Sequence, residues 1–290
     1  MEYDVRHRTT YRYLQDVSYS CHVAHLTPRA TPAQEVEASK TALSLAPARR
    51  QAVTDYFGNA MEWFSFDQPH TNLEILSTSR VRVKPVADPA DRGPAWEAVK
   101  ALLAAAPTPE PRGAVQYLFD SPLVTAPGGI ADYAAKSFVP GRPILDAAAD
   151  LMHRIHKEFR YDPTVTDAST PAARVFEIRA GVCQDLAHIG IAALRALGLA
   201  ARYVSGYLVT KPPPGKPRLV GADASHAWFS VWSPEHGWFD LDPTNDMRPS
   251  EGHITVAWGR DYSDVAPVNG IVSGGGDHVV DVGVDVLPVA

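Results

Sequence analysis

The hydrophobic pattern of this 290-residue chain changes twice, and the order of the changes limits the folds that it can adopt. From residue 1 to about 84, short alternating runs such as Tyr3–His7 and Leu73–Val83 are separated by prolines and by the turn around Gly58. Such runs predict strands of an antiparallel sandwich or barrel. Helical periodicity follows as far as Leu197, and strand-like runs return from Ala201. Helices followed by strands, instead of strict alternation, predict an α+β fold with an antiparallel sheet.

These changes divide the chain into three predicted segments. We expect a β-rich N-terminal domain over residues 1–84, a linker with broken helices over 85–139, and a core that includes C-terminal strands over 140–290. The many prolines are typical of turns and element boundaries. In the core, the apolar residues that follow Pro143 keep close to the 3.6-residue period, and proline suits the first turn of a helix. A helix is therefore expected there.

Composition and charge exclude several classes of protein. The net charge of −6 and the absence of a dominant basic face argue against nucleic acid as a partner. No apolar run approaches the ~20 residues that cross a bilayer, and the first ten residues lack the apolar core of a signal peptide. Cys21 and Cys183 are far apart in unlike contexts, so a disulfide framework is not expected. We therefore predict a cytoplasmic protein with no membrane partner.

Cys183 follows a loop glycine and begins a helical pattern that ends before Gly198. At the first turn of a helix, a cysteine lies near unpaired backbone N–H groups and the positive end of the helix dipole, which favour the reactive thiolate. Gly181 would let the chain approach the helix start closely. The pattern predicts a nucleophile at Cys183, although most lone cysteines are small buried apolar residues.

Two predicted strands, Ser225–Trp232 and Trp238–Asp242, are joined by a short connection that contains proline and glycine. This length and composition predict a hairpin. In the simplest register, the tryptophans that flank the turn, Trp232 and Trp238, lie opposite each other. Because side chains alternate along a strand, the even-numbered positions of both strands then share one face.

That register brings His226 within reach of Asp242. Asp240 shares the same face but lies about 6–7 Å farther along its strand, so it is the second choice of partner. A carboxylate beside an imidazole fixes the ring tautomer and favours the imidazolium, which in turn favours a thiolate. The sequence thus predicts a thiol, an imidazole and a carboxylate that act together.

Neighbouring residues have more ordinary interpretations. His188, one turn beyond Cys183, is typical of a helix-face histidine with a buried hydrogen bond. Four of the six tryptophans lie between Trp228 and Trp258, and we interpret them as core and not as the wall of a substrate channel. Zinc chemistry is the weaker alternative, because the sequence has no C-x2-C pair and no H-E-x-x-H helix.

Four motifs in this order resemble the transglutaminase-like superfamily, a branch of the papain-like cysteine enzymes. They are Arg179–His188, Leu197–Tyr207, Ser225–Trp228 and Gly237–Asn245. The N-terminal stretch, with Leu26–Arg29 and Tyr56–Asn59, resembles the β-rich domain that precedes this core in a bacterial subfamily. The resemblance implies a papain-like core, with its antiparallel sheet packed on helices, in residues 140–290.

The resemblance also implies roles: Cys183 as nucleophile, His226 as general base and acid, and Asp242 as the orienting carboxylate. Papain-like peptidases carry a glutamine shortly before the cysteine, and residues 177–182 contain none, so the Cys183 amide is the oxyanion donor that we name. The expected activity is cysteine-dependent acyl transfer on amide bonds of a protein or peptide substrate, without a metal or organic cofactor. A cysteine peptidase or amidase with the same triad, and a non-catalytic protein-binding module, are the alternatives.

Overall fold

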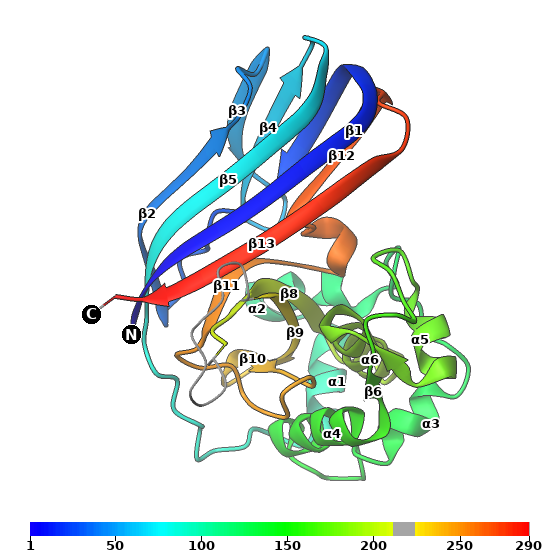
Figure 1. Cartoon of the computed structure of the whole chain (residues 1–290). Coiled ribbons are helices and arrows are strands. Elements are labelled where there is room, and N and C mark those ends of the chain that lie inside the picture. The colour runs from blue at the N-terminus through cyan, green and yellow to red at the C-terminus, as the bar shows by residue number, and fades with distance from the viewer. Residues whose placement is uncertain (211–223, 290) are drawn as a thin grey trace, which may run out of the picture.

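A seven-stranded antiparallel sheet is built around one long strand, β1 (Glu2–Ala24). The structure is a computed structural model and describes residues 1–210 and 224–289. The other strands of this sheet are β2 (Gln34–Leu43), β3 (Arg49–Thr54), β4 (Ala60–Phe66), β5 (His70–Val83), β12 (Val268–Gly274) and β13 (His278–Pro288). Their order is β2-β5-β1-β4-β3, and β12 and β13 also pair with β1 (Figure 1).

Strand β1 changes neighbours along its length. Its first half pairs with β5 and β13, and its second half pairs with β4 and β12. The pairing with β5 shifts register between Arg12 and Val17, where the strand passes from one set of partners to the other. The predicted short run Tyr3–His7 is therefore part of a much longer strand. Buried side chains at Tyr3, Val5 and His7 keep the period of two that the sequence indicates.

The C-terminal strands complete this first sheet. The sequence predicts C-terminal strands that belong to the core, but β13 pairs with β1 and does not extend the sheet of the core. Val284 and Val286 of β13 are buried in the main apolar cluster, so the same strand also packs against the core. The predicted division at residues 84 and 139 itself stays a prediction.

Helices follow the first sheet along the chain. They are α1 (Trp96–Ala105), α2 (Pro109–Val115), the 3-10 turn η1 (Gln116–Leu118), α3 (Ile130–Ala135), α4 (Ile144–Glu158), α5 (Ala172–Ile178) and α6 (Cys183–Ala196). The helices expected after Pro143 and from Cys183 are confirmed as α4 and α6. A short parallel pair, β6 (Arg160–Tyr161) and β7 (Ala180–Gly181), brings the end of α4 beside the start of α6.

The core sheet has four antiparallel strands in the order β10-β9-β8-β11. They are β8 (Ala201–Leu208), β9 (Ala224–Ser233), β10 (Gly237–Leu241) and β11 (His253–Gly259), followed by the 3-10 turn η2 (Tyr262–Asp264). In Figure 1 this sheet lies between the long sheet and the helices. An antiparallel sheet packed on helices confirms the predicted α+β class.

Helix α6 packs closely on β9, and a glycine makes this possible. A Cβ atom at Gly190 would come within 2.5 Å of the Phe229 ring, so a larger residue would force the helix and the sheet apart. Because Phe229 faces α6, alternation places His226, Trp228 and Ser230 on the opposite face of β9. The core sheet therefore presents an apolar face to the helices and a mixed face on its other side.

Two amide side chains join the long sheet to the core. Gln34 donates to the carbonyl of Thr255 (2.7 Å) and accepts from its N–H (2.9 Å). Asn59 does the same with Trp258, at 2.9 and 3.0 Å. β11 is an edge strand, and these amides satisfy edge groups that would otherwise be open to pairing with another chain. Each amide thus replaces a strand partner.

Candidate active site

Cys183 is the first residue of α6, and the loop before it is held by a carboxylate of the same helix. Asp185 accepts hydrogen bonds from the Val182 N–H (2.8 Å) and the Thr166 hydroxyl (2.6 Å). A Cβ atom at Gly181 would collide with the Asp185 carboxylate, which is why the loop needs a glycine there. The Cys183 side chain is half-buried. The predicted helix-start position of the thiol is confirmed, and the glycine makes room for a capping carboxylate.

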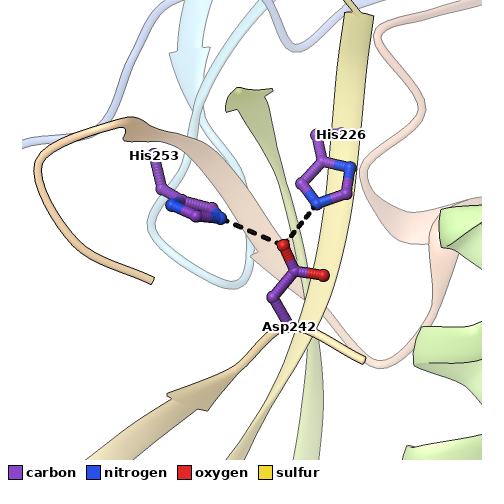
Figure 2. A group of neighbouring side chains, drawn as sticks. All are labelled: His226, Asp242 and His253. Carbon is purple, nitrogen blue, oxygen red and sulfur yellow. Dashed lines mark hydrogen bonds and ion pairs between the residues drawn. The ribbon is translucent and has the colours of Figure 1, made fainter. Parts of the chain in front are cut away.

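The hairpin register is the one expected from the sequence. Trp238 lies opposite Trp232, and His226 Nε2 lies 2.7 Å from Asp242 Oδ2 (Figure 2). Asp240 instead accepts the hydroxyl hydrogen bond of Ser230 on the neighbouring strand. Asp242, and not Asp240, is therefore the partner of the histidine.

Asp242 lies directly after β10 and is fully buried. Its Oδ1 accepts backbone N–H groups from Thr244 (2.9 Å) and Asn245 (3.2 Å), and its Oδ2 accepts the Asn245 amide (2.7 Å) and His253 Nε2 (3.0 Å). Burial alone would raise the pKa of Asp242. The hydrogen bonds from His226 and His253 outweigh burial and hold that pKa far below its usual value. The carboxylate is thus fixed in place and ionised.

His226 is held between this carboxylate and the thiol. Its Nε2 faces Asp242, and the Cys183 side chain also interacts with the ring. Burial would lower the pKa of His226, but the hydrogen bonds with Asp242 and Cys183 raise it to about 10. The imidazole is therefore charged at neutral pH. The described residues bring together all three side chains that the sequence singled out.

A second histidine, His253, was not found by sequence reasoning. It begins β11 and donates from Nε2 to Asp242, while its Nδ1 accepts the Ser250 N–H at 3.4 Å. A His253 ring that carries its single proton on Nε2 can make both of these hydrogen bonds. The available signal was a histidine at the head of the apolar run Ile254–Trp258, which has the composition of a strand.

His188 does not join this group. It is fully buried, its Nε2 accepts the N–H of Tyr262 at 3.2 Å, and its ring lies against Tyr203. Burial lowers the pKa of His188 to about 4, so the ring is neutral. The interpretation as a helix-face histidine with a buried hydrogen bond is confirmed.

Asp242 and the two histidines bonded to it also form a group that could hold a metal ion among the described residues. His226, Asp242 and His253 offer two imidazole nitrogens and one carboxylate oxygen, all within 4.8 Å of one another. Two histidines and a carboxylate are a familiar donor set for divalent transition metals. In the geometry described, however, both imidazoles are hydrogen-bonded to the carboxylate, which explains their proximity without an ion.

A cysteine at a helix start that meets a histidine and an aspartate of adjacent strands defines, together with the fold, a transglutaminase-like protein. Residues 3–82 match the family model of the bacterial transglutaminase-like N-terminal region, and residues 132–243 match that of the transglutaminase-like superfamily. The chain belongs to the bacterial transglutaminase-like family.

Relatives match either the whole chain or its core. An uncharacterized protein of Mycobacterium tuberculosis is 42% identical over 99% of this chain and 92% of its own length. A protein-glutamine gamma-glutamyltransferase of Pseudomonas aeruginosa is 37% identical over 105 residues, which are 35% of this chain and 16% of that protein. A solved structure from Cytophaga hutchinsonii, described as a candidate cysteine protease, covers 100% of this chain and 92% of its own with a TM-score of 0.76 at 20% identity, which shows the shared fold. No helix in the described ranges is long and apolar enough to cross a bilayer.

Proposed function

We propose that the protein is a cysteine-dependent acyl-transfer enzyme that acts on amide groups of a protein or peptide. One observation carries the proposal: the His226 ring is hydrogen-bonded to Asp242 and interacts with the Cys183 side chain, and these contacts raise its pKa to about 10, so that it is charged at neutral pH. A charged imidazole beside a thiol is the arrangement that stabilises a thiolate. The helix start at Cys183 favours the same form.

The chemistry proceeds in two halves. The Cys183 sulfur bonds to the amide carbonyl carbon, and the oxyanion is stabilised by the Cys183 N–H at the start of α6. As the carbon–nitrogen bond breaks, the His226 imidazolium gives its proton to the leaving amine, and a thioester remains. His226 then takes a proton from water or from a second amine as that group attacks the thioester, which releases the product and regenerates the Cys183 thiolate beside the His226 imidazolium. Asp242 keeps the ring oriented throughout.

The acceptor decides between transferase and hydrolase. An amine acceptor gives transglutamination, as the name of the Pseudomonas relative describes for that protein, whereas water gives an amidase or a peptidase. Incubation with dimethylcasein and dansylcadaverine separates the outcomes. Dye incorporation indicates a transferase, ammonia release without incorporation indicates an amidase, and new N-termini indicate a peptidase. Cys183→Ala is the inactive control, and activity that survives a chelator excludes a required metal at His226 and His253.

Alkylation tests the activated thiol without a known substrate. Iodoacetamide should modify Cys183 faster than Cys21, which is also partly exposed and serves as the internal reference. His226→Ala should remove the difference. If Cys183 reacts no faster than Cys21 and His226→Ala changes nothing, the proposal fails and a non-catalytic binding module becomes the better interpretation.

A further inference from the structure

A cavity of about 800 Å³ lies beside the candidate active site, on the mixed face of the core sheet. Its wall includes Trp228 and His253, but not Cys183, His226 or Asp242. The opposite wall comes from the first sheet and its loops, among them Arg29 and Phe57. The volume is typical of a site for a small organic molecule. The wall is rich in aromatic and cationic side chains, and this composition carries the inference.

Arg202 of β8 is the most unusual residue of the wall. It is only 7% exposed, and its guanidinium lies between two indole rings, 4.4 Å from the centroid of Trp238 and 3.8 Å from that of Trp258. Among the described residues, its one hydrogen bond runs from Nε to the Ser230 hydroxyl at 3.4 Å, and no carboxylate lies within ion-pair distance. Burial lowers the pKa of Arg202 to about 10, which leaves it charged at neutral pH.

Burying a cation is costly, so such groups are normally paired. Asp240 partly balances the charge of Arg202 through Ser230, which accepts from Arg202 Nε and donates to Asp240. The two indoles cover the faces of the guanidinium but cannot satisfy its terminal N–H groups, which point along the plane of the group. These N–H groups form the fork that binds a carboxylate or a phosphate through two parallel hydrogen bonds. The free edge of Arg202 therefore has the geometry of an anion site.

A second cation lies on the other face of the same indole. The Arg29 guanidinium is 3.6 Å from the centroid of Trp258, and two guanidiniums this close to one ring must occupy opposite faces. Arg29 donates from Nη1 to Asn59 and to the carbonyl of Phe57, so its position is fixed. Arg248 also lines the cavity and is anchored by the carbonyl of Ala87.

The wall holds two carboxylates, Asp240 and Glu110, against the three guanidiniums of Arg29, Arg202 and Arg248. Asp240 lies near Arg202 and favours its charged form, whereas Glu110 is exposed. The wall therefore keeps an excess of positive charge. The wall also contains aromatic residues, among them Trp228, which is fully buried and whose Nε1 has no hydrogen-bond partner among the described residues. A flat apolar body would complement the aromatic part of the wall.

We propose that this cavity binds a small molecule that carries one carboxylate or phosphate group on a flat, apolar body. The anionic group binds the free edge of Arg202, with Arg29 and Arg248 supplying further positive charge, and the body lies against Trp238. The site is distinct from the thiol. His253 links the two, because it lines the cavity and donates to Asp242.

Calorimetric titration of the full chain tests the proposal with matched ligands. Indole-3-acetate carries the anion and the flat body, indole-3-acetamide has the same body without charge, and phenyl phosphate distinguishes phosphate from carboxylate. At least one of the two anions should bind about tenfold or more tightly than the amide. Arg202→Met should remove this preference, while Arg174→Met, which changes an exposed arginine outside the cavity, should keep it.

Circular dichroism first establishes that each variant is folded. Should Arg202→Met fail to fold, Arg29→Met and Arg202→Lys carry the same comparison, because the first removes a cation and the second keeps the charge but loses the fork. Equal affinity for anion and amide overturns the proposal. So does anion binding that is unchanged in the arginine variants, or no binding of either anion below about 1 mM.

Discussion

At the scale of the residue, the site is organised by a single carboxylate. Asp242 holds two histidines from two strands, and only one of them also meets the thiol. Its own position is fixed by the backbone of the turn that follows it, so the orientation of His226 ultimately depends on the turn Asp242–Asn245. In the proposed mechanism the two histidines therefore contribute differently: His226 exchanges protons with the substrate, and His253 positions the carboxylate.

The protonation of His226 is the first prediction. Because its pKa in the folded chain is raised from 6.5 to about 10, the ring should stay charged through neutral pH. Stability from this charge is fully present below pH 6.5 and is lost as the pH rises through about 10. NMR of labelled histidine should show this late titration, and Asp242→Asn should move it back toward 6.5. A ring that titrates near 6.5 in the unmodified protein contradicts the prediction.

His253 gives the second prediction. His253→Ala removes one hydrogen bond from Asp242 and should slow Cys183 alkylation, or lower kcat at unchanged KM, by about tenfold, equivalent to about 1.4 kcal/mol. The pKa of His226 should fall as well, a change that a purely structural role would not produce. His253→Gln keeps an N–H donor and should restore part of the rate. His153→Ala, at a half-exposed histidine on α4, is the control.

Much of the site could be predicted from sequence because local rules decide it. Hairpin length fixes the parity of β9 and β10, and parity alone selects Asp242 over Asp240 as the partner of His226. His253 could not be predicted, because its contact with Asp242 joins strands that are not neighbours in the sheet. The residue pattern within a single strand does not indicate such a contact. The interpretation of the tryptophans as core is confirmed for Trp228 and Trp232, which are buried, whereas Trp238 and Trp258 are only partly buried and line the cavity.

At the scale of the element, the edge of β11 shows why fold class was easier to predict than the packing of the two sheets. The sequence shows that Gln34 is a polar residue of a strand. Only the folded structure shows that its amide replaces a strand partner for the backbone of Thr255. Asn59 lies in the turn between β3 and β4, and the composition of this segment predicts the turn but not the contact with Trp258. Both side chains are buried, at 4% and 0% exposure, so their amides have no access to water as a substitute partner.

These two amides give the third prediction. Gln34→Ala and Asn59→Ala each leave backbone groups of β11 unpaired and should lower the free energy of unfolding by about 1–3 kcal/mol. The matched controls are Gln51→Ala and Asn72→Ala, which change exposed residues of β3 and β5 and should stay within about 0.5 kcal/mol of the unmodified protein. Urea titration measures all four. Equal effects at buried and exposed positions would mean that the edge of β11 is satisfied by solvent.

At the scale of the whole molecule, the two ends of the chain meet in one sheet, and that sheet also covers the core. β1 and β13 pair along eleven residues, and Val284 and Val286 of β13 enter the main apolar cluster together with residues of α6 and β9. Strand β13 therefore follows the core in sequence but lies in the same sheet as β1. Segments that are contiguous in the sequence do not correspond to separate units in space. A chain joined in this way should unfold as one unit.

Val284→Ala tests this cooperativity. Truncating a valine that is 2% exposed should cost about 1–3 kcal/mol, whereas Val282→Ala, two residues earlier on the same face but 51% exposed, should cost little. Tryptophan fluorescence reports mainly on the core, because five of the six tryptophans lie between Trp96 and Trp258, and far-ultraviolet circular dichroism reports on the strands of both sheets. In Val284→Ala, both signals should shift to the same lower midpoint. A shift in circular dichroism with unchanged fluorescence would instead show that the long sheet unfolds independently of the core that carries Cys183.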